Sequence, residues 1–82
     1  MDKDTLSLEA FVQQLEAQFE ELAPGSMYAE LEFRQLPEWT SMQSLIVIAS
    51  FDWDYGVTVS AEDLRAAVTV ADLYELVRSK MV

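Results

Sequence analysis

The side chains that could carry chemistry are few in this 82-residue chain, because it contains no histidine and no cysteine. Their absence excludes a Ser-His-Asp triad, a cysteine nucleophile, a thiolate or imidazole metal site and a disulfide. Fifteen Asp and Glu residues outnumber five Lys and Arg, which gives a formal net charge of −10. Such a charge repels phosphate backbones, so we expect no nucleic-acid partner, and it favours proteins with basic surfaces.

Carboxylates remain as candidates, but each arrangement has a simpler interpretation. Asp52-x-Asp54-x-Gly56, with Asp63 further on, matches the start of an EF-hand loop only in part. The glycine stands at the fifth instead of the sixth position, and valines occupy two positions that should donate oxygen. The pairs Glu20-Glu21 and Glu62-Asp63 have no apolar pocket around them in the sequence. We therefore predict no metal site and no catalytic carboxylate pair.

Ser41 is the hydroxyl in the most suggestive place. Thr40-Ser41-Met42-Gln43 fits a capping box, with Thr40 as N-cap and Gln43 at the third helical position. Ser41 then opens a helix after a long loop, with its hydroxyl exposed. A serine at a helix start is ordinarily a capping or solvent-facing residue. A phosphate esterified there would nevertheless be stabilised by the free N–H groups and the positive end of the helix dipole.

The first half of the chain predicts one helix and one long loop. Residues 6–22 carry apolar side chains three and four positions apart, with Ser7 or Thr5 as cap and Pro24-Gly25 as the end. Residues 24–40 show no lasting periodicity and leave room for a short helix over 27–31. The expected core residues of the helix are Leu8, Phe11, Val12, Leu15, Phe19 and Leu22.

The second half predicts three helices. Leu45–Ile48 would suit a buried strand, but the capping box before it and Gly56 after it favour a helix over 41–55. We expect its core face to carry Met42, Leu45, Val47 or Ile48, Phe51 and Tyr55. Ser60 opens a short helix through Leu64 and Ala67, and Thr69 opens another to about Lys80 that buries Val70, Leu73, Tyr74, Leu76 and Val77. The prediction is an all-α, single-domain, small four-helix bundle over residues 1–82, with a short third helix and a long loop between helices 1 and 2.

In this order and spacing, the segments resemble the acyl carrier protein family over essentially the whole chain. Trp39–Leu45 is similar to the family's attachment motif, usually Asp-Ser-Leu at a helix start. Tyr55–Val59 resembles the turn after the second helix, Ser60–Leu64 the third helix, and Thr69–Val77 the Thr-Val-x-Asp-Leu start of the fourth. Phe33-x-x-Leu36-x-x-Trp39 is similar to a discrete bacterial subtype.

The resemblance implies that Ser41 receives 4′-phosphopantetheine from coenzyme A through a phosphopantetheinyl transferase. The terminal thiol of this arm would carry acyl groups as thioesters in fatty-acid, polyketide or related acyl biosynthesis. The chain would then be a carrier and no enzyme, docking as a monomer onto basic patches of acyl-loading and acyl-transferring enzymes. We expect a cytoplasmic protein without a membrane span, because Met1 precedes charged residues and the longest apolar run, Leu45–Ala49, is short.

The chain also departs from the family pattern. Thr40 replaces the usual Asp, Met42 the usual Leu, and Gln43, Ser44 and Ile46 stand where acidic residues are frequent. Ile46 and Trp53 cannot all point inward with the other apolar residues of 41–55, so an exposed apolar strip marks a partner surface unless the 24–40 loop covers it. The docking candidates are Thr40, Met42, Gln43, Ile46 and Trp53. Two alternatives stay open: an unmodified, acidic protein-interaction module of the same fold, and a carrier of amino acids.

Overall fold

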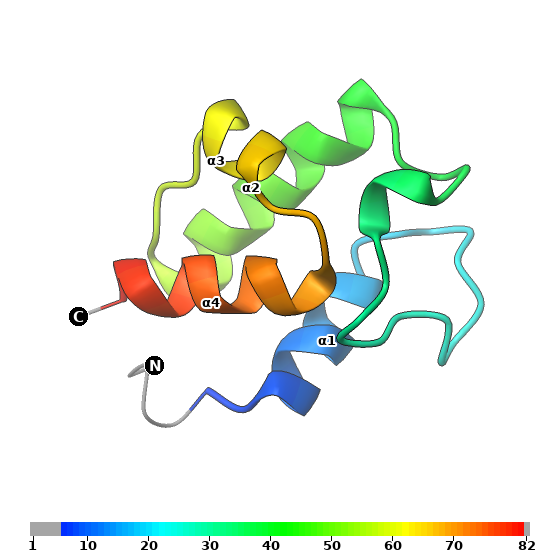
Figure 1. The fold of residues 1–82 in the computed structure, drawn as a ribbon, viewed down its shortest axis with the longest axis horizontal. Helices are drawn as coiled ribbons and strands as arrows, with labels where there is room; N and C mark the ends of the chain where they lie inside the picture. The colour runs from blue at the N-terminus through cyan, green and yellow to red at the C-terminus, as the bar shows by residue number, and fades with distance from the viewer. Residues whose placement is uncertain (1–5, 82) are drawn as a thin grey trace.

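The computed structural model describes residues 6–81, and the secondary structure within them is helical (Figure 1). This confirms the predicted all-α arrangement of four helices, with a short third helix and a long connection between the first two. The elements are α1 (Leu8–Glu16), the 3₁₀ helix η1 (Phe33–Gln35), α2 (Ser41–Tyr55), α3 (Ala61–Ala66) and α4 (Val70–Lys80).

The helix starts follow the capping signals in the sequence. Ser7 Oγ accepts a hydrogen bond from the Ala10 N–H at 3.1 Å, which makes Ser7 the cap of α1. Ser60 and Asp63 form a complete capping box at α3, in which each side chain accepts from the other residue's N–H. Thr69 and Asp72 form the same box at α4. These three starts lie where the sequence predicts them.

The end of α1 corrects a prediction, because the helix stops at Glu16 and does not continue to residue 22. The Glu16 carboxylate accepts hydrogen bonds from the Gly25 N–H at 3.0 Å and the Met27 N–H at 2.9 Å. Beyond it the backbone tightens into turns with bonds of three-residue spacing, such as Phe19 N–H to the Glu16 carbonyl. Phe19 is still buried, so the apolar periodicity identified a core residue but not the helix end.

The loop between α1 and α2 also differs from its prediction. Its short helix is η1 at 33–35, and not a helix over 27–31. The Leu31 carbonyl accepts from the Val70 N–H at 3.0 Å, and the Ala29 carbonyl accepts from the Ala71 N–H at 2.8 Å. These bonds use the free donors of the first turn of α4, which a local helix over 27–31 would not reach. The loop is therefore fixed by the last helix of the chain.

Helix α2 confirms the helical interpretation of residues 41–55 and corrects its face. Gly56 ends the helix with a left-handed φ of 68°, which glycine adopts without strain. Val47 and Phe51 are fully buried, while Met42 and Leu45 lie on the solvent side. Because Leu45–Ile48 presents apolar side chains around the whole helix, periodicity could not select the buried face.

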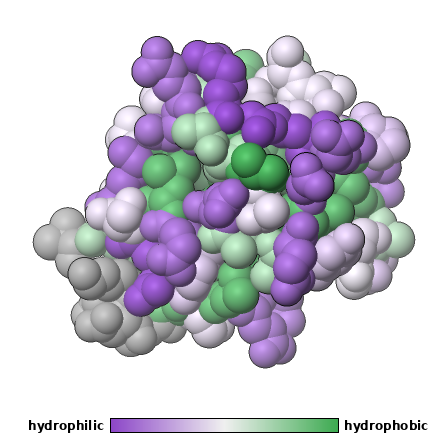
Figure 2. Space-filling model, viewed as in Figure 1, coloured by the Kyte–Doolittle hydropathy of each residue, from purple (hydrophilic) through white to green (hydrophobic). Residues whose placement is uncertain are grey.

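Phe11 joins three of the helices in the core. Its ring stacks on Phe51 of α2 with centroids 5.6 Å apart and meets the edge of Tyr74 of α4 at 5.5 Å. Helix α1 packs on α4, and α2 packs on α3 (Figure 1). The surface seen from this side is mostly hydrophilic, with small apolar patches between polar side chains (Figure 2). One long side of α2 is therefore left outside the core.

Candidate functional site

Ser41 is the first residue of α2, and its side chain is exposed. Thr40 is the cap: its Oγ1 accepts from the Gln43 N–H at 3.1 Å, and its carbonyl accepts from the Ser44 N–H. The Ser41 hydroxyl makes no hydrogen bond with another residue in the 6–81 range. Because Thr40 already caps the N-terminus of α2, the Ser41 hydroxyl is left accessible at a site where the helix dipole favours a phosphate.

Gln43 shows that the predicted capping box at α2 is only half formed. The Gln43 side chain does not return to the Thr40 backbone, since its Nε2 donates to the Gln18 carbonyl at 2.9 Å. Gln18 lies in the turns that follow α1, so this bond joins them to the first turn of α2. The half-buried amide of Gln43 thus positions the start of α2 against the turns that follow α1.

A hollow of about 430 Å³ lies beside Ser41, between η1, the start of α2 and α3. Arg34 of η1 spans its side, because the Arg34 Nη1 donates to the Arg65 carbonyl at 2.7 Å. No local pattern in the sequence indicates either arginine, since the two are 31 positions apart. The hollow is lined by Arg34, Trp39, Thr40, Ser41, Ser44, Ala61, Leu64 and Arg65.

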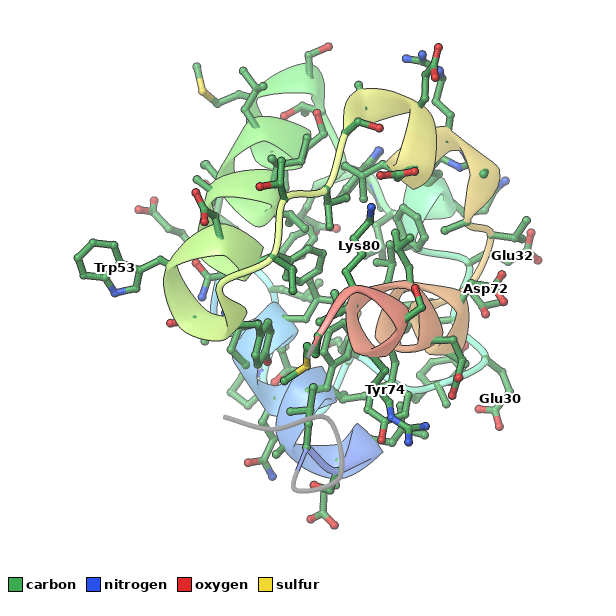
Figure 3. All side chains as sticks on the ribbon, turned by 90° about the vertical axis from the view of Figure 1, so that its left-hand side faces the viewer. Glu30, Glu32, Trp53, Asp72, Tyr74 and Lys80 are labelled. Carbon is green, nitrogen blue, oxygen red and sulfur yellow. The ribbon has the colours of Figure 1, made fainter. Side chains whose placement is uncertain are left out.

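A continuous apolar face lies on the outside of α2. We define the apolar face of α2 as Met42, Leu45, Ile46 and Trp53, which are 67%, 62%, 41% and 90% exposed. Trp53 projects away from the molecule (Figure 3). The 24–40 loop does not cover these side chains. Three docking candidates from the sequence therefore lie together here, and Leu45, predicted to be buried, belongs with them.

The acidic residues lie around this face and away from it. Helix α2 has no charged residue until Asp52 and Asp54 in its last turns. At its other end, Ile46 borders a hollow that also contains Glu20, Glu21 and Glu38. Other acids, Glu30, Glu32 and Asp72, are on the side of the molecule opposite to Trp53 (Figure 3). The apolar face of α2 is thus flanked by negative charge at both ends.

Two of the carboxylates singled out from the sequence, Asp54 and Asp63, have structural partners, and so does Asp72 at the start of α4. Hydrogen bonds from the Ser60 backbone and side chain lower the pKa of Asp63, which also lies 3.4 Å from Lys80 Nζ. The backbone N–H groups of Thr69 and Val68 lower the pKa of Asp72. Asp54 accepts a hydrogen bond from the Gln14 side chain. Among residues 6–81 no three acidic side chains are grouped so that they could hold a metal ion.

Comparison with known proteins establishes the fold. Neither a protein-family model nor a curated protein sequence matches this chain. Among solved structures, the chain is similar to the solution NMR structure of a holo acyl carrier protein from Geobacter metallireducens, with a TM-score of 0.73 and 22% identity. The match covers 89% of this chain and 83% of that one. The chain therefore has the acyl carrier protein fold, as the resemblance of its segments predicts.

Helix length and hydrophobicity also bear on the site. None of the helices within residues 6–81 is both long enough and apolar enough to cross a bilayer. The apolar face of α2 is the exposed side of that helix. Its other side, with Val47 and Phe51, is the part that stays in the core.

Proposed function

We propose that this chain is an acyl carrier protein, a single carrier domain over residues 1–82 that is modified with 4′-phosphopantetheine on Ser41. The observation that carries the proposal is the Ser41 hydroxyl at the start of α2 in this fold, which is exposed and makes no hydrogen bond with another residue of the 6–81 range. The residues around Ser41 suit a phosphate ester, because Thr40 caps the helix and no acid lines the adjoining hollow. When attached, the arm supplies a terminal thiol that holds an acyl group as a thioester.

The protein itself acts as a carrier in this proposal, serving fatty-acid, polyketide or related acyl biosynthesis. Its residues present Ser41 to a phosphopantetheinyl transferase and dock onto enzymes that load or remove acyl groups. The docking surface is the apolar face of α2, which contains the candidates Met42, Ile46 and Trp53, with Thr40 and Gln43 at its N-terminal end. The flanking acids favour partners in which a nonpolar centre is bordered by Lys and Arg.

Intact-mass spectrometry tests the modification. The protein is incubated with coenzyme A and a broad-specificity phosphopantetheinyl transferase, and we expect the mass gain of one phosphopantetheine group. Ser41→Ala should abolish the gain. Ser44→Ala is the matched control, since it removes a hydroxyl one helical turn away and should keep the gain. The proposal is refuted if the protein without substitutions gains no mass, or if the gain survives Ser41→Ala.

A second candidate is an unmodified protein-interaction module with the same fold. Thr40 favours it, because the carboxylate that usually precedes the modified serine is missing, and so does the apolar face of α2. In that case protein purified from its native source stays unmodified at Ser41. Partner binding is then lost on Trp53→Gln and unaffected by Ser41→Ala.

A further inference from the structure

We propose that the hollow beside Ser41 is a docking site for the phosphopantetheine arm, in which Arg34 and Arg65 bind its phosphate. This inference rests on the proposed function and concerns where the arm lies once Ser41 is modified. Ser41 itself lines the hollow, so an ester of its hydroxyl places a phosphate at the edge of it.

The distribution of charge separates this hollow from the rest of the surface. Of the basic side chains within residues 6–81, Arg78 pairs with Glu75 at 3.5 Å and Lys80 pairs with Asp63 at 3.4 Å. In that range, Arg34 and Arg65 have no carboxylate within ion-pair distance. In a chain with 15 acids and 5 bases, the two unpaired arginines of the described residues thus meet at one place.

Three other hollows of the surface have the opposite character. One on α1 contains two glutamates, one at the ends of α1 and α2 contains three, and one between α3 and α4 contains three carboxylates. The hollow beside Ser41 is lined by no carboxylate. An anionic group attached to Ser41 therefore meets attraction at this hollow and repulsion at those three.

The guanidinium of Arg34 suits a phosphate. The hydrogen bond from the Arg34 Nη1 to the Arg65 carbonyl fixes one guanidinium at the hollow and uses one of its five donors. The remaining donors form the planar fork that binds phosphate oxygens in pairs. The first turn of α2 adds its positive dipole end on the same side. The phosphate is thus met by the Arg34 guanidinium and a helix terminus, with Arg65 as a second basic residue in the lining.

The remaining lining fits the nonpolar part of the arm next to the phosphate. Trp39 and Leu64 supply apolar surface, and Trp39 is fixed by its edge contact with Phe33 at 4.9 Å. Ser44 and Ser41 mark the flank of α2 that borders the hollow, whereas Ile46 borders the separate, acidic hollow at the other flank. An arm docked in this way leaves the apolar face of α2 free, so arm docking and partner docking do not compete.

The experiment compares the arm in three modified proteins by NMR, after intact mass has shown complete modification of each. In the original sequence we expect cross-peaks from the arm's geminal methyl groups to the Trp39 ring and the Leu64 methyls. Arg65→Gln, which keeps the backbone carbonyl that Arg34 binds, should lower the docked-to-free ratio about fivefold, which corresponds to about 1 kcal/mol. Arg78→Gln makes the same charge change far from the hollow and should leave the cross-peaks unchanged. Raising the salt to about 1 M, where charges are screened beyond about 3 Å, should weaken them in the original sequence.

The outcomes separate this inference from the function on which it rests. A chain that never gains the arm refutes the proposed function and this inference together. A modified chain whose arm shows no cross-peaks to Trp39 or Leu64 refutes this inference alone. Equal losses of these cross-peaks in Arg65→Gln and Arg78→Gln also refute this inference alone, because they would show an effect of net charge and not of a local site.

Discussion

The contrast between the core and the apolar face of α2 can be tested by making the same substitution, leucine to alanine, at one buried and one exposed position and comparing the loss of stability. Leu15 of α1 is 1% exposed, and Leu45 of α2 is 62% exposed. Truncating a buried leucine to alanine removes its transfer free energy and leaves a cavity, at a cost of about 3–5 kcal/mol. Leu45 buries little more than a third of its area, so the same truncation should cost about 1 kcal/mol or less. A domain of this length has about 4–12 kcal/mol of total stability, so Leu15→Ala removes a large part of it.

Urea unfolding followed by circular dichroism measures both effects. With a urea m-value near 1 kcal/mol/M for a small domain, Leu45→Ala should lower the midpoint by about 1 M at most and Leu15→Ala by about 3 M or more. Both variants are measured at two protein concentrations, because pairing of two copies through the apolar face of α2 would make the apparent stability depend on concentration. Equal losses in the two variants, or a loss above about 2 kcal/mol for Leu45→Ala, would show that Leu45 is covered and refute the exposed face.

The same two-leucine comparison has a functional readout. If the apolar face of α2 is the docking surface, Leu45→Ala should lower the transferase kcat/KM about five- to tenfold while the protein remains folded. An unchanged kcat/KM would remove Leu45 from the docking surface.

Three further predictions follow from the caps and the titratable groups. Thr69→Ala removes the side-chain acceptor of the α4 capping box and should lower the unfolding free energy by about 1 kcal/mol and the Tm by about 4–8 °C; an unchanged thermal melt would contradict the role of the cap. The pKa values of Asp63 and Asp72 are lowered by backbone hydrogen bonds, so their stabilisation is complete above the unfolded pKa near 3.9 and is lost as the pH falls through the folded values; a ¹³C titration of the carboxyl carbons that finds ordinary pKa values would refute this. Burial, and then the charge of Asp54, raise the pKa of Tyr55 to about 12, so stability should be complete below pH 10 and fall as the pH rises through 12; an ultraviolet titration in which every tyrosine ionises near pH 10 would contradict it.

Local signals in the sequence predicted most of the fold. Ser60 and Thr69 start helices because a hydroxyl and a carboxylate three positions apart satisfy backbone groups within one turn. Gly56 ends α2 for an equally local reason, its left-handed backbone. The position of Ser41 as first residue of α2 was predictable in the same way, because Thr40 lies directly before it as the cap. Features set within four or five residues are therefore readable without a structure.

The features that were not predicted depend on residues far apart in the chain. The last residue of α1, Glu16, holds the following loop, because its carboxylate accepts from N–H groups nine and eleven positions away. The exposure of Leu45 was not predictable, because the apolar run around it contains no polar residue that would show which side of the helix faces solvent. Arg34 and Arg65 come together only when η1 reaches the end of α3. No pattern along the sequence brings these partners together, so packing alone determines them.

The two hydrogen bonds between the first turn of α4 and the 24–40 loop bear on the order in which a new chain can assemble. Ala29 and Leu31 are made well before Val70 and Ala71, their donors, leave the ribosome. Until then their carbonyls have no partner in α4, and the loop that leads to Ser41 lacks its attachment. We expect the loop to settle only after α4 has been made, so that the proposed modification of Ser41 should be more efficient on chains that include α4 than on shorter ones. Protease digestion of ribosome-bound chains of increasing length would test this, because protection of the loop should begin only after α4 has emerged.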